Sequence, residues 1–375
     1  MKTNSSIITA AQITTAIEEV APLRYQEPYD NAGFCTGNPQ SEVNGVLLCV
    51  DITEQVIEEA LAIGANLIIS HHPVIFKAIK RLTGNTRVER IIEKAIKNDI
   101  ILYAAHTNID NVAQGVSYAM GHKLGLKDLR VLSPRHGELV KLAVFVPQSQ
   151  AEYLRDVLFA AGAGHIGNYS HCSFSVDGKG TYFPEEGSNP FSGVPGKMHT
   201  EPETRIEVIL PRATLPLAIQ ALLQAHPYED PAYDIYPLDN AYAETGAGAV
   251  GNLPTPLTVP GFLQALQTAF STKIIRYSAT QDSFVRKIAL CGGSGAFLLQ
   301  EAKSAGAQVF VSADFKYHDF FDVENCILIA DIGHFESEQC VLDVFYNCLT
   351  KKFPTFAVSL TKVGENPVKY MIKET

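Results

Sequence analysis

The sequence lacks several features that would assign it directly to a class of proteins. It contains no run of about 18 apolar residues, so we expect no membrane span. It has no long cluster of lysine and arginine, and its net charge at pH 7 is −10. This balance argues against a broad grip on nucleic-acid phosphates, although not against a small anionic substrate in a local pocket. Residues 1–22 lack the apolar stretch of a signal peptide and predict a short amphipathic helix.

Cysteine is scarce, and its pattern is unlike that of a disulfide framework. The seven cysteines are odd in number, include no C-x-x-C pair and mostly lie in apolar runs. We therefore expect buried free thiols in a reducing compartment and a cytoplasmic protein. The chain has 375 residues, 46% of them hydrophobic and 19% charged. That composition is typical of globular proteins, and the length exceeds one typical core.

Two segments far apart in the chain share a pattern. Residues 58–72 (EEALAIGANLIISHH) align with residues 300–314 (QEAKSAGAQVFVSAD), and Glu, Ala, Gly, Ala and Ser coincide. Each segment predicts a helix that closes at a glycine, then a short buried strand, then polar side chains. Residues 100–110 and 327–338 each place an apolar strand before His-x-x-x-carboxylate. We interpret these pairs as a duplication, although two unrelated helix–strand units could share as many residues by chance.

The region between the halves predicts a different fold. Residues 135–240 predict the order strand, helix, strand, strand, helix, strand, which is the ferredoxin-like plan. The glycine- and alanine-rich segment 244–254 then returns the chain to the main fold. We therefore predict an α/β protein of two similar halves, residues 1–134 and 241–375, interrupted by an inserted domain. Strands that alternate with helices predict mainly parallel sheets in the halves.

Histidines and carboxylates follow the predicted strands. His71 and His72 end the strand NLIIS, and Pro73 disfavours further strand pairing. Neighbours within a strand point to opposite faces, so two adjacent imidazoles can serve one site only where the strand ends. His334 and Glu338 are four residues apart in a predicted helix over residues 335–349 and can share a face. Taken alone, a His-His pair or a lone H-x-x-x-E is more often structural or solvated.

The combined set is more specific than its parts. Three imidazoles and two carboxylates, one able to bridge, suit a pair of Zn²⁺, Fe²⁺ or Mn²⁺ ions. They suit Mg²⁺ and Ca²⁺ poorly, because those ions prefer oxygen ligands. The candidate ligands are His71, His72, Asp110, His334 and Glu338.

The order of the motifs resembles that of one known family. The segments SHHP (70–73), HTNID (106–110), SADFKYHD (312–319) and DIGHFESE (331–338) resemble motifs of the Nif-three-like family. Its members are hexameric proteins with a dinuclear metal centre, also catalogued as GTP cyclohydrolase 1 type 2 homologues. EPYDNAGFCTGNP resembles the family's W-D-N-x-G segment, with Tyr29 in place of the usual Trp. HIGNYSHCSF and HPYEDPAYD resemble the insert of longer bacterial members, which is similar to PII and CutA proteins.

This resemblance implies roles for the residues. It makes the five candidate ligands the holders of two divalent transition-metal ions per subunit, with Glu338 as the bridge. It implies a toroidal homohexamer and a hydrolase in which metal-activated water attacks the guanine ring of GTP and formate is released. Where the family often has Gly-Asp, this chain has Ala313-Asp314.

Several interpretations stay open. His106 is a further metal ligand, a residue behind the ligands or a structural residue. His106 and His318 are candidate proton donors to the opened ring. His318 could instead merely hydrogen-bond Asp319. The segment CGGSG (291–295) either holds a phosphate at a helix start or forms a tight connection. The centre could equally cleave a phosphoester, or bind metal for regulation or delivery without catalysis. Five ligands for two ions leave positions for water, which favours the hydrolase.

Overall fold

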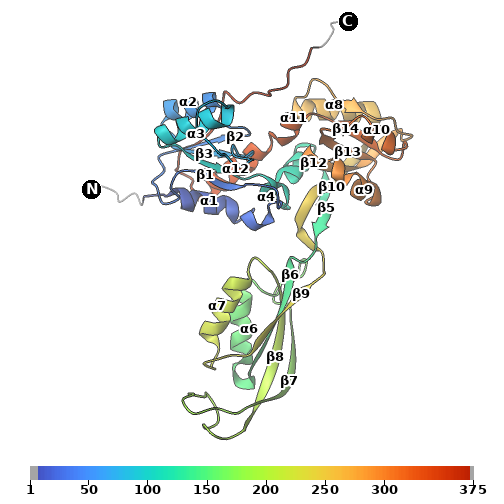
Figure 1. Cartoon of the computed structure of the whole chain (residues 1–375). Helices are drawn as coiled ribbons and strands as arrows, with labels where there is room; N and C mark the ends of the chain where they lie inside the picture. Colours follow the sequence, from blue (N-terminus) through green and yellow to red (C-terminus); the bar gives the residue numbers. More distant parts are fainter. Residues whose placement is uncertain (1–6, 372–375) are drawn as a thin grey trace. The chain divides into compact units, whose positions relative to one another are not determined.

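The computed structural model describes residues 7–371 and divides into two compact units (Figure 1). One unit combines the residues up to Pro134 with those from Ala243 onward, and the other is Arg135–Tyr242. Every predicted site residue belongs to the first unit. Among the described residues, no helix is both long and apolar enough to cross a membrane.

The first unit contains two sheets. The five-stranded sheet has the order β1-β4-β3-β2-β15. Its strands are β1 (Gly33–Thr36), β4 (Ile101–Ala104), β3 (Leu67–Ser70), β2 (Val46–Cys49) and β15 (Val358–Leu360). Its pairs are parallel except for β1 with β4. The helices of this part of the chain are α1 (Ala10–Glu18), η1 (Leu23–Tyr25), α2 (Glu54–Ile63), α3 (Arg87–Lys97), α4 (Thr107–Asp110) and α5 (Val116–Lys123).

The six-stranded sheet has the order β11-β14-β13-β12-β10-β5. Its strands are β11 (Arg276–Tyr277), β14 (Leu328–Asp331), β13 (Val309–Ala313), β12 (Phe284–Ser294), β10 (Tyr242–Thr258) and β5 (Lys127–Arg135). Strands β12, β13 and β14 pair in parallel, whereas β11 and β10 are antiparallel to their neighbours β14 and β12. The helices here are α8 (Val259–Phe270), η3 (Ala296–Leu298), α9 (Leu299–Ser304), α10 (Asp319–Asp322), α11 (His334–Glu338) and α12 (Val341–Lys352).

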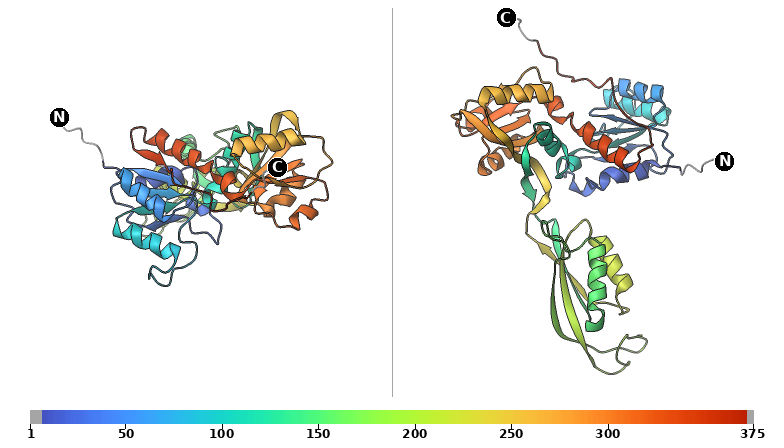
Figure 2. Two further views of the ribbon diagram at one scale, coloured as in Figure 1. Left: turned by 90° about the horizontal axis from the view of Figure 1, so that it is seen from above. Right: turned by 180° about the vertical axis from the view of Figure 1, so that it is seen from behind.

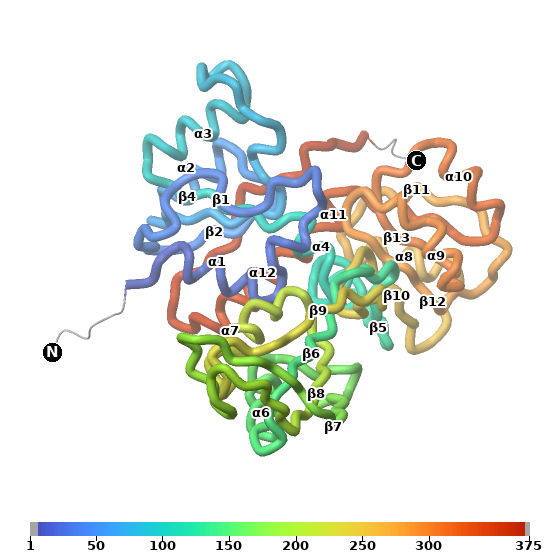
Figure 3. The backbone as a smooth tube through the Cα atoms, turned by 60° about the horizontal axis from the view of Figure 1, so that its bottom comes forward, coloured from blue at the N-terminus to red at the C-terminus, as the bar shows by residue number. Residues whose placement is uncertain are grey.

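The two sheets repeat one plan and exchange edge strands. The order β1-β4-β3-β2 matches β11-β14-β13-β12. Strand β5 comes from the first half of the chain but joins the second sheet, and β15 comes from the C-terminal part but joins the first. Helix α12, red in Figures 2 and 3, likewise packs against α1 and β2 of the first half. The sequence did not predict this exchange, because β5 and β15 carry no feature that identifies their sheet.

Local sequence explains why the inner strands end at one edge. Strands β2, β3 and β4 are buried along their whole length, as expected of inner parallel strands with both faces covered. Helix α2 begins at the N-cap Thr53, whose side chain accepts from the N–H of Val56, and it ends at Gly64 with φ 75°. That left-handed residue costs glycine little and turns the chain into β3. The carboxyl end of β3 is therefore fixed in place.

The segment predicted as one helix over residues 335–349 is two helices, α11 and α12. At the junction the N–H of Leu342 donates to the carbonyl of Gln339, so the hydrogen-bond spacing tightens from four residues to three. Helix α11 is therefore a separate short turn that carries His334 and Glu338.

The second unit contains a four-stranded antiparallel sheet in the order β7-β8-β6-β9. Its elements follow the chain order β6 (Leu139–Pro147), η2 (Gln148–Gln150), α6 (Ala151–Ala160), β7 (Ser173–Tyr182), β8 (His199–Pro211), α7 (Leu215–Ala225) and β9 (Tyr233–Leu238). Both helices lie on one face of this sheet (Figure 1) and share a core with β6 and β8.

Candidate metal centre

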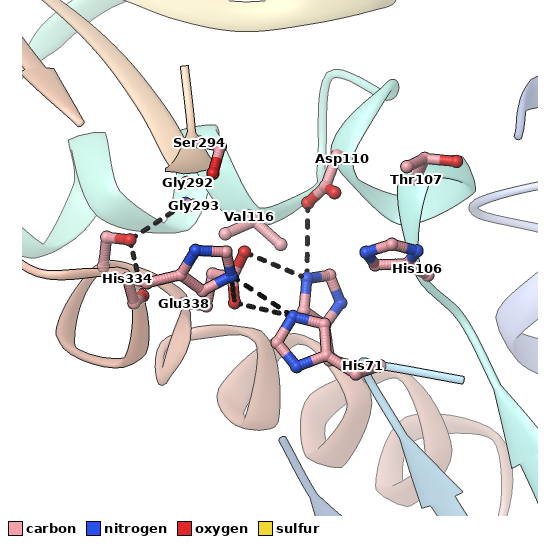
Figure 4. Close-up of polar contacts among 12 residues, drawn as sticks. His71, His106, Thr107, Asp110, Val116, Gly292, Gly293, Ser294, His334 and Glu338 are labelled. Atoms are coloured by element: carbon pink, nitrogen blue, oxygen red, sulfur yellow. Dashed lines mark hydrogen bonds and ion pairs between the residues drawn. The ribbon is translucent and has the colours of Figure 1, made fainter. Parts of the chain in front are cut away.

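The five predicted ligands come together from strand ends of both sheets (Figure 4). His71 and His72 directly follow β3, Asp110 ends α4 after β4, and α11 after β14 carries His334 and Glu338. The carboxyl ends of parallel strands are where open α/β sheets place their ligands. The repeated plan therefore brings two such edges to one place.

The ligand atoms form two groups that share Glu338. In one group, Nε2 of His71 lies 3.6 Å from Oε1 of Glu338 and 3.7 Å from Oδ1 of Asp110. In the other, Oε2 of Glu338 lies 3.0 Å from Nε2 of His72 and 3.1 Å from Nε2 of His334. These two nitrogens are 3.4 Å apart. Ligands bound at about 2.0–2.1 Å around one tetrahedral ion are about 3.3–3.4 Å apart. The second group, with its three distances of 3.0, 3.1 and 3.4 Å, has this spacing, and in the first group His71 lies at a similar distance from each of the two carboxylates.

Each imidazole is anchored through its other nitrogen. A carboxylate or carbonyl oxygen can only accept, so Nδ1–H is the donor in each case and Nε2 is left for the centre. Metal-binding histidines are typically held in this way. The four pairs are His71 with the carbonyl of Ala105 at 3.0 Å, His72 with Asp51 at 3.0 Å, His106 with Asp30 at 2.7 Å and His334 with Asp314 at 2.7 Å.

The facing atoms have no hydrogen bonds of their own. Nε2 of His71, Oδ1 of Asp110 and Oε2 of Glu338 are buried and have no partner with hydrogen-bond geometry. Oε2 of Glu338 is in this set although Nε2 of His72 and Nε2 of His334 lie 3.0 and 3.1 Å away. Orphaned buried polar atoms are costly in a protein interior. Their convergence in one place fits the binding of cations among them.

The electrostatics of the cluster depend on the two carboxylates. Burial opposes the protonated imidazole of His72, but Asp51 and Glu338 outweigh it and raise the pKa of His72 to about 10. Burial likewise opposes protonation of His334, while Glu338 and Asp314 raise its pKa to about 9. Burial also opposes ionisation of Glu338, but His71, His334 and His72 hold the pKa of Glu338 well below its ordinary value. Glu338 is thus an ionised carboxylate, 3% exposed, in the middle of the cluster.

Gly293 makes room for that carboxylate, and the neighbouring Gly292 makes room for Val116. Gly293 has φ 60°, and a Cβ added there would lie 2.2 Å from Oε1 of Glu338. A Cβ at Gly292 would lie 2.5 Å from Cγ1 of Val116. The N–H of Gly293 already donates to Oγ of Ser337. Gly293 of the CGGSG segment therefore has a role in admitting Glu338, independent of any phosphate.

A cavity of about 490 Å³ opens beside the cluster, lined by Asp110, His334 and Glu338 and by the aromatic rings of Tyr29 and Phe297. Both rings are two-thirds exposed. A larger cavity, of about 950 Å³, lies against α1, α5 and α12 and is lined by none of the predicted site residues. The smaller cavity is the one in which a bound molecule would reach the candidate ligands.

Comparison with known proteins identifies the family of this chain. The model of the family Duf34/NIF3 (NGG1p interacting factor 3) matches residues 8–367. The chain belongs to the Duf34/NIF3 family.

Relatives of known name and structure agree with this assignment. A protein of Halalkalibacterium halodurans named GTP cyclohydrolase 1 type 2 homolog is 42% identical over 307 residues, which is 81% of this chain and 82% of the relative. One of the same name from Bacillus subtilis is 35% identical over 97% of this chain and 99% of its own length. Among solved structures, a Bacillus cereus protein related to NIF3 superposes with a TM-score of 0.87 at 37% identity. That match covers 98% of this chain and 100% of the solved chain.

The two histidines predicted as proton donors occupy different places in this Duf34/NIF3 chain. His106 lies at the cluster, and its ring is 5.3 Å from those of both His71 and His72. Its ligating nitrogen lies within 4.8 Å of theirs. The carboxylates of Asp110 and Glu338 lie 3.7 and 3.6 Å from Nε2 of His71. We take these two groups as its partners, with His106 beside them.

The structure does not bring His318 into the cluster. His318 precedes α10, is exposed, and packs its ring against Tyr317 and Phe321. The side chain of Asp319 accepts instead from the backbone N–H of Lys316.

Two anchoring carboxylates escaped the sequence-based prediction. Asp51 follows β2 and holds His72, and Asp30 holds His106. Asp30 also accepts from the backbone and side chain of Thr107. Asp51 could have been found by the same strand-end argument that identified the ligands. Asp30 lies in the motif EPYDNAG, but nothing in the sequence indicates a partner 76 residues away.

Proposed function

We propose that this protein is a dinuclear metal-dependent hydrolase of the GTP cyclohydrolase 1 type 2 kind. His71 and Asp110 would hold one divalent transition-metal ion, His72 and His334 the other, and Glu338 would bridge them. The single observation that carries the proposal is the convergence of candidate ligand atoms, three of them buried without a hydrogen-bond partner. Within each group the imidazole nitrogens lie 3.0–3.7 Å from carboxylate oxygens. When bound, such a pair of Zn²⁺, Fe²⁺ or Mn²⁺ ions supplies an activated water and a Lewis acid.

The surroundings support catalysis rather than storage of metal. Each group offers three protein atoms, which leaves coordination positions free, as in catalytic rather than structural sites. The adjoining cavity of about 490 Å³ is within the usual range for small-molecule sites. Tyr29 and Phe297 give that cavity aromatic surfaces on which a planar base such as guanine can pack. GTP is therefore the substrate that we propose, with release of formate.

His106 is suited to hold a proton at the centre. Asp30 fixes the tautomer by accepting from Nδ1, so Nε2 is free to give or take a proton on the side facing His71 and His72. Burial alone would raise the pKa of Asp30. The hydrogen bonds that Asp30 accepts from His106 and Thr107 outweigh burial and hold this pKa far below its ordinary value. Asp30 therefore stays ionised and keeps His106 in one orientation. His318 would need to act from another subunit, since it lies outside the cluster of its own chain.

Incubation with GTP after loading with Zn²⁺, Fe²⁺ or Mn²⁺ tests the proposal. Formate in equal amount to GTP consumed supports ring opening, whereas inorganic phosphate without formate would identify a phosphohydrolase instead. Fully loaded protein that releases neither would identify a metal-binding regulatory protein. His106→Ala should keep two ions and lose formate release, and His318→Ala serves as the paired variant. Loss of turnover in His318→Ala alone would move the proton donor to that residue.

We further propose the assembly and the nature of the insert. The family resemblance suggests a toroidal homohexamer, for which light scattering of the purified protein is the direct test; a stable monomer would contradict it.

The order β-α-β-β-α-β with strands arranged β7-β8-β6-β9 supports a ferredoxin-like insert of the PII/CutA kind and the three-part division of the chain. All seven cysteines are free thiols, which supports a cytoplasmic location.

A further inference from the structure

The second unit contains a cavity of about 520 Å³ that the proposed hydrolase does not use. It lies where β7, β8 and the segment after α7 meet. Aromatic rings form much of its wall, namely Phe145, Tyr182, Phe183, Phe191 and Tyr228. Tyr182 and Phe191 pack against Tyr228 with ring centroids 5.9 and 6.2 Å apart. Their faces carry the negative side of the aromatic quadrupole and attract cations.

The charged side chains that line this cavity are all acidic, while the guanidinium of Arg205 lies over the ring of Phe145, 5.6 Å from its centroid. Glu203, Glu185, Glu229 and Asp230 line it, and none of its lining residues is a lysine, arginine or histidine. A cleft lined by charges of one sign concentrates ions of the opposite sign. The aromatic and the carboxylate linings thus favour the same kind of ligand, a cation.

Glu203 is the decisive group, because it is buried without a counter-charge. Its side chain belongs to a residue that is only 9% exposed, yet it lines the cavity. Its Oε1 accepts from the hydroxyl of Tyr228 at 2.8 Å, and among residues 7–371 no cationic side chain forms an ion pair with it. Burial and the adjacent Glu203 raise the pKa of Tyr228, which therefore remains a neutral donor. Buried carboxylates are normally paired, so the unpaired charge points to a ligand.

A glycine keeps the second oxygen of Glu203 accessible. A Cβ at Gly180 would lie 2.0 Å from Oε2 of Glu203. Any residue other than glycine at position 180 would therefore displace the carboxylate. The remaining carboxylates, Glu185, Glu229 and Asp230, are exposed, and one oxygen of Glu229 accepts from the N–H of Asn189. The cavity is thus lined by one buried carboxylate and three exposed ones.

We infer that this cavity binds an aliphatic di- or polyamine. A primary ammonium would donate to the buried Glu203, and a second ammonium would lie among the exposed carboxylates. A quaternary ammonium could use the rings but could not donate to Glu203. A metal ion is disfavoured, because within the described chain the groups of three ligand atoms close enough to surround one ion lie only in the other unit.

Isothermal titration of the full-length, metal-loaded protein with spermidine tests the inference. We expect saturable binding of one spermidine per chain, and weaker binding of butylamine, which has a single ammonium. Glu203→Gln keeps the shape of the side chain and removes its charge, so affinity should fall about tenfold or more. Glu152→Gln removes the same charge from an exposed position at the start of α6 and should leave affinity unchanged.

A second variant guards against misfolding of Glu203→Gln. Phe183 is half exposed, so Phe183→Leu should fold normally while removing one aromatic wall, and it should weaken spermidine binding about threefold or more. The inference is overturned by absence of saturable binding, or by equal losses in Glu203→Gln and Glu152→Gln. The second result would show attraction to the overall negative charge rather than to this cavity. Both results leave the hydrolase proposal unaffected, since formate release is measured separately.

Discussion

The two halves of the metal-site unit share a strand order but differ in the side chains at their strand ends. After β3 the chain places His71 and His72, whereas the matching β13 ends at Ala313 and is followed by Asp314. After β4 comes Asp110, and after the matching β14 comes Glu338. The first half thus gives two imidazoles to the centre, while the second gives the longer carboxylate.

The two carboxylates, which differ in length by one methylene, approach different numbers of imidazoles. Oδ1 of Asp110 lies 3.7 Å from His71. Glu338 reaches His71 with one oxygen and His72 and His334 with the other. Each ligand group therefore contains residues from both halves, and neither half could form the centre alone. The exchanged edge strands β5 and β15 tie the halves together, which explains how groups from separate sheets keep a fixed spacing.

The largest effect should come from replacing the bridging carboxylate. Glu338→Gln keeps size and shape but removes the charge between the two proposed ions, so both should be lost. Turnover should fall by more than the roughly 10–100-fold typical of residues that only support ligands. Asp110→Asn is the matched change in the other half and should affect mainly the group of His71. Elemental analysis and formate release measure both.

The fold should survive in both variants, because the cores consist of strand residues such as Leu47 and Ile329 and not of the ligands. Circular dichroism provides this control. If Glu338→Gln retained two ions and full hydrolysis, the bridging role would have to move to Asp110.

The next effect concerns the space around Glu338. Gly293→Ala places a methyl group 2.2 Å from Oε1 of Glu338 at a residue with φ 60°, so the carboxylate must move and metal affinity should fall. Gly64→Ala imposes the same left-handed backbone at φ 75°, with no atom within 4 Å of the added Cβ. It should cost about 1 kcal/mol of stability and no metal. Equal metal content in the two variants would show that backbone strain alone matters.

A smaller effect is expected from the anchoring carboxylates, one in each half. Asp51→Asn and Asp314→Asn weaken the bonds that orient His72 and His334, and each should lower metal affinity by about 10–100-fold. Asp51 is half-buried, whereas Asp314 is exposed, so the loss should be greater for Asp51. Competitive titration with a metal-sensitive dye measures both affinities, and a greater loss in Asp314→Asn would reverse this ranking of the halves.

The sequence predicted the strands and the polar residues that directly follow them, but it did not predict contacts between residues far apart in the chain. The apolar runs and their polar ends located β3, β4, β13 and β14, because each strand and its following residues are contiguous. The anchors were missed because a hydrogen bond such as that between His106 and Asp30 spans 76 residues. The edge strands β5 and β15 were missed for a related reason, since hydrophobic alternation predicts a strand but not its sheet. The need for glycine at position 293 follows only from the approach of Glu338 in space.

The smallest predicted effect concerns His226, which belongs to the second unit. This histidine is 7% exposed. Its Nδ1 accepts from the N–H of Tyr228 at 3.1 Å, so Nε2–H is the donor to the carbonyl of Phe145 at 3.0 Å. Burial lowers the pKa of His226, and the bond to Phe145 only partly offsets this. The neutral imidazole is thus the form that fits the fold.

The sign of the pH dependence follows from that lowered pKa. Above the ordinary value of about 6.5, His226 is neutral in both folded and unfolded chains and adds no pH dependence. Below about pH 6.5, the unfolded chain takes up a proton at His226 that the folded unit does not. The free energy of unfolding therefore decreases as the pH is lowered, until the pKa of the folded unit is reached. The side-chain amide introduced by His226→Gln can donate and accept in the same places without titrating. Urea unfolding at about pH 7.5 and about pH 5.5 should therefore show a smaller loss in the variant than in the parent. The exposed His165→Gln is the matched control, and an equal loss in all three proteins would show that His226 is protonated as easily in the fold as in the unfolded chain.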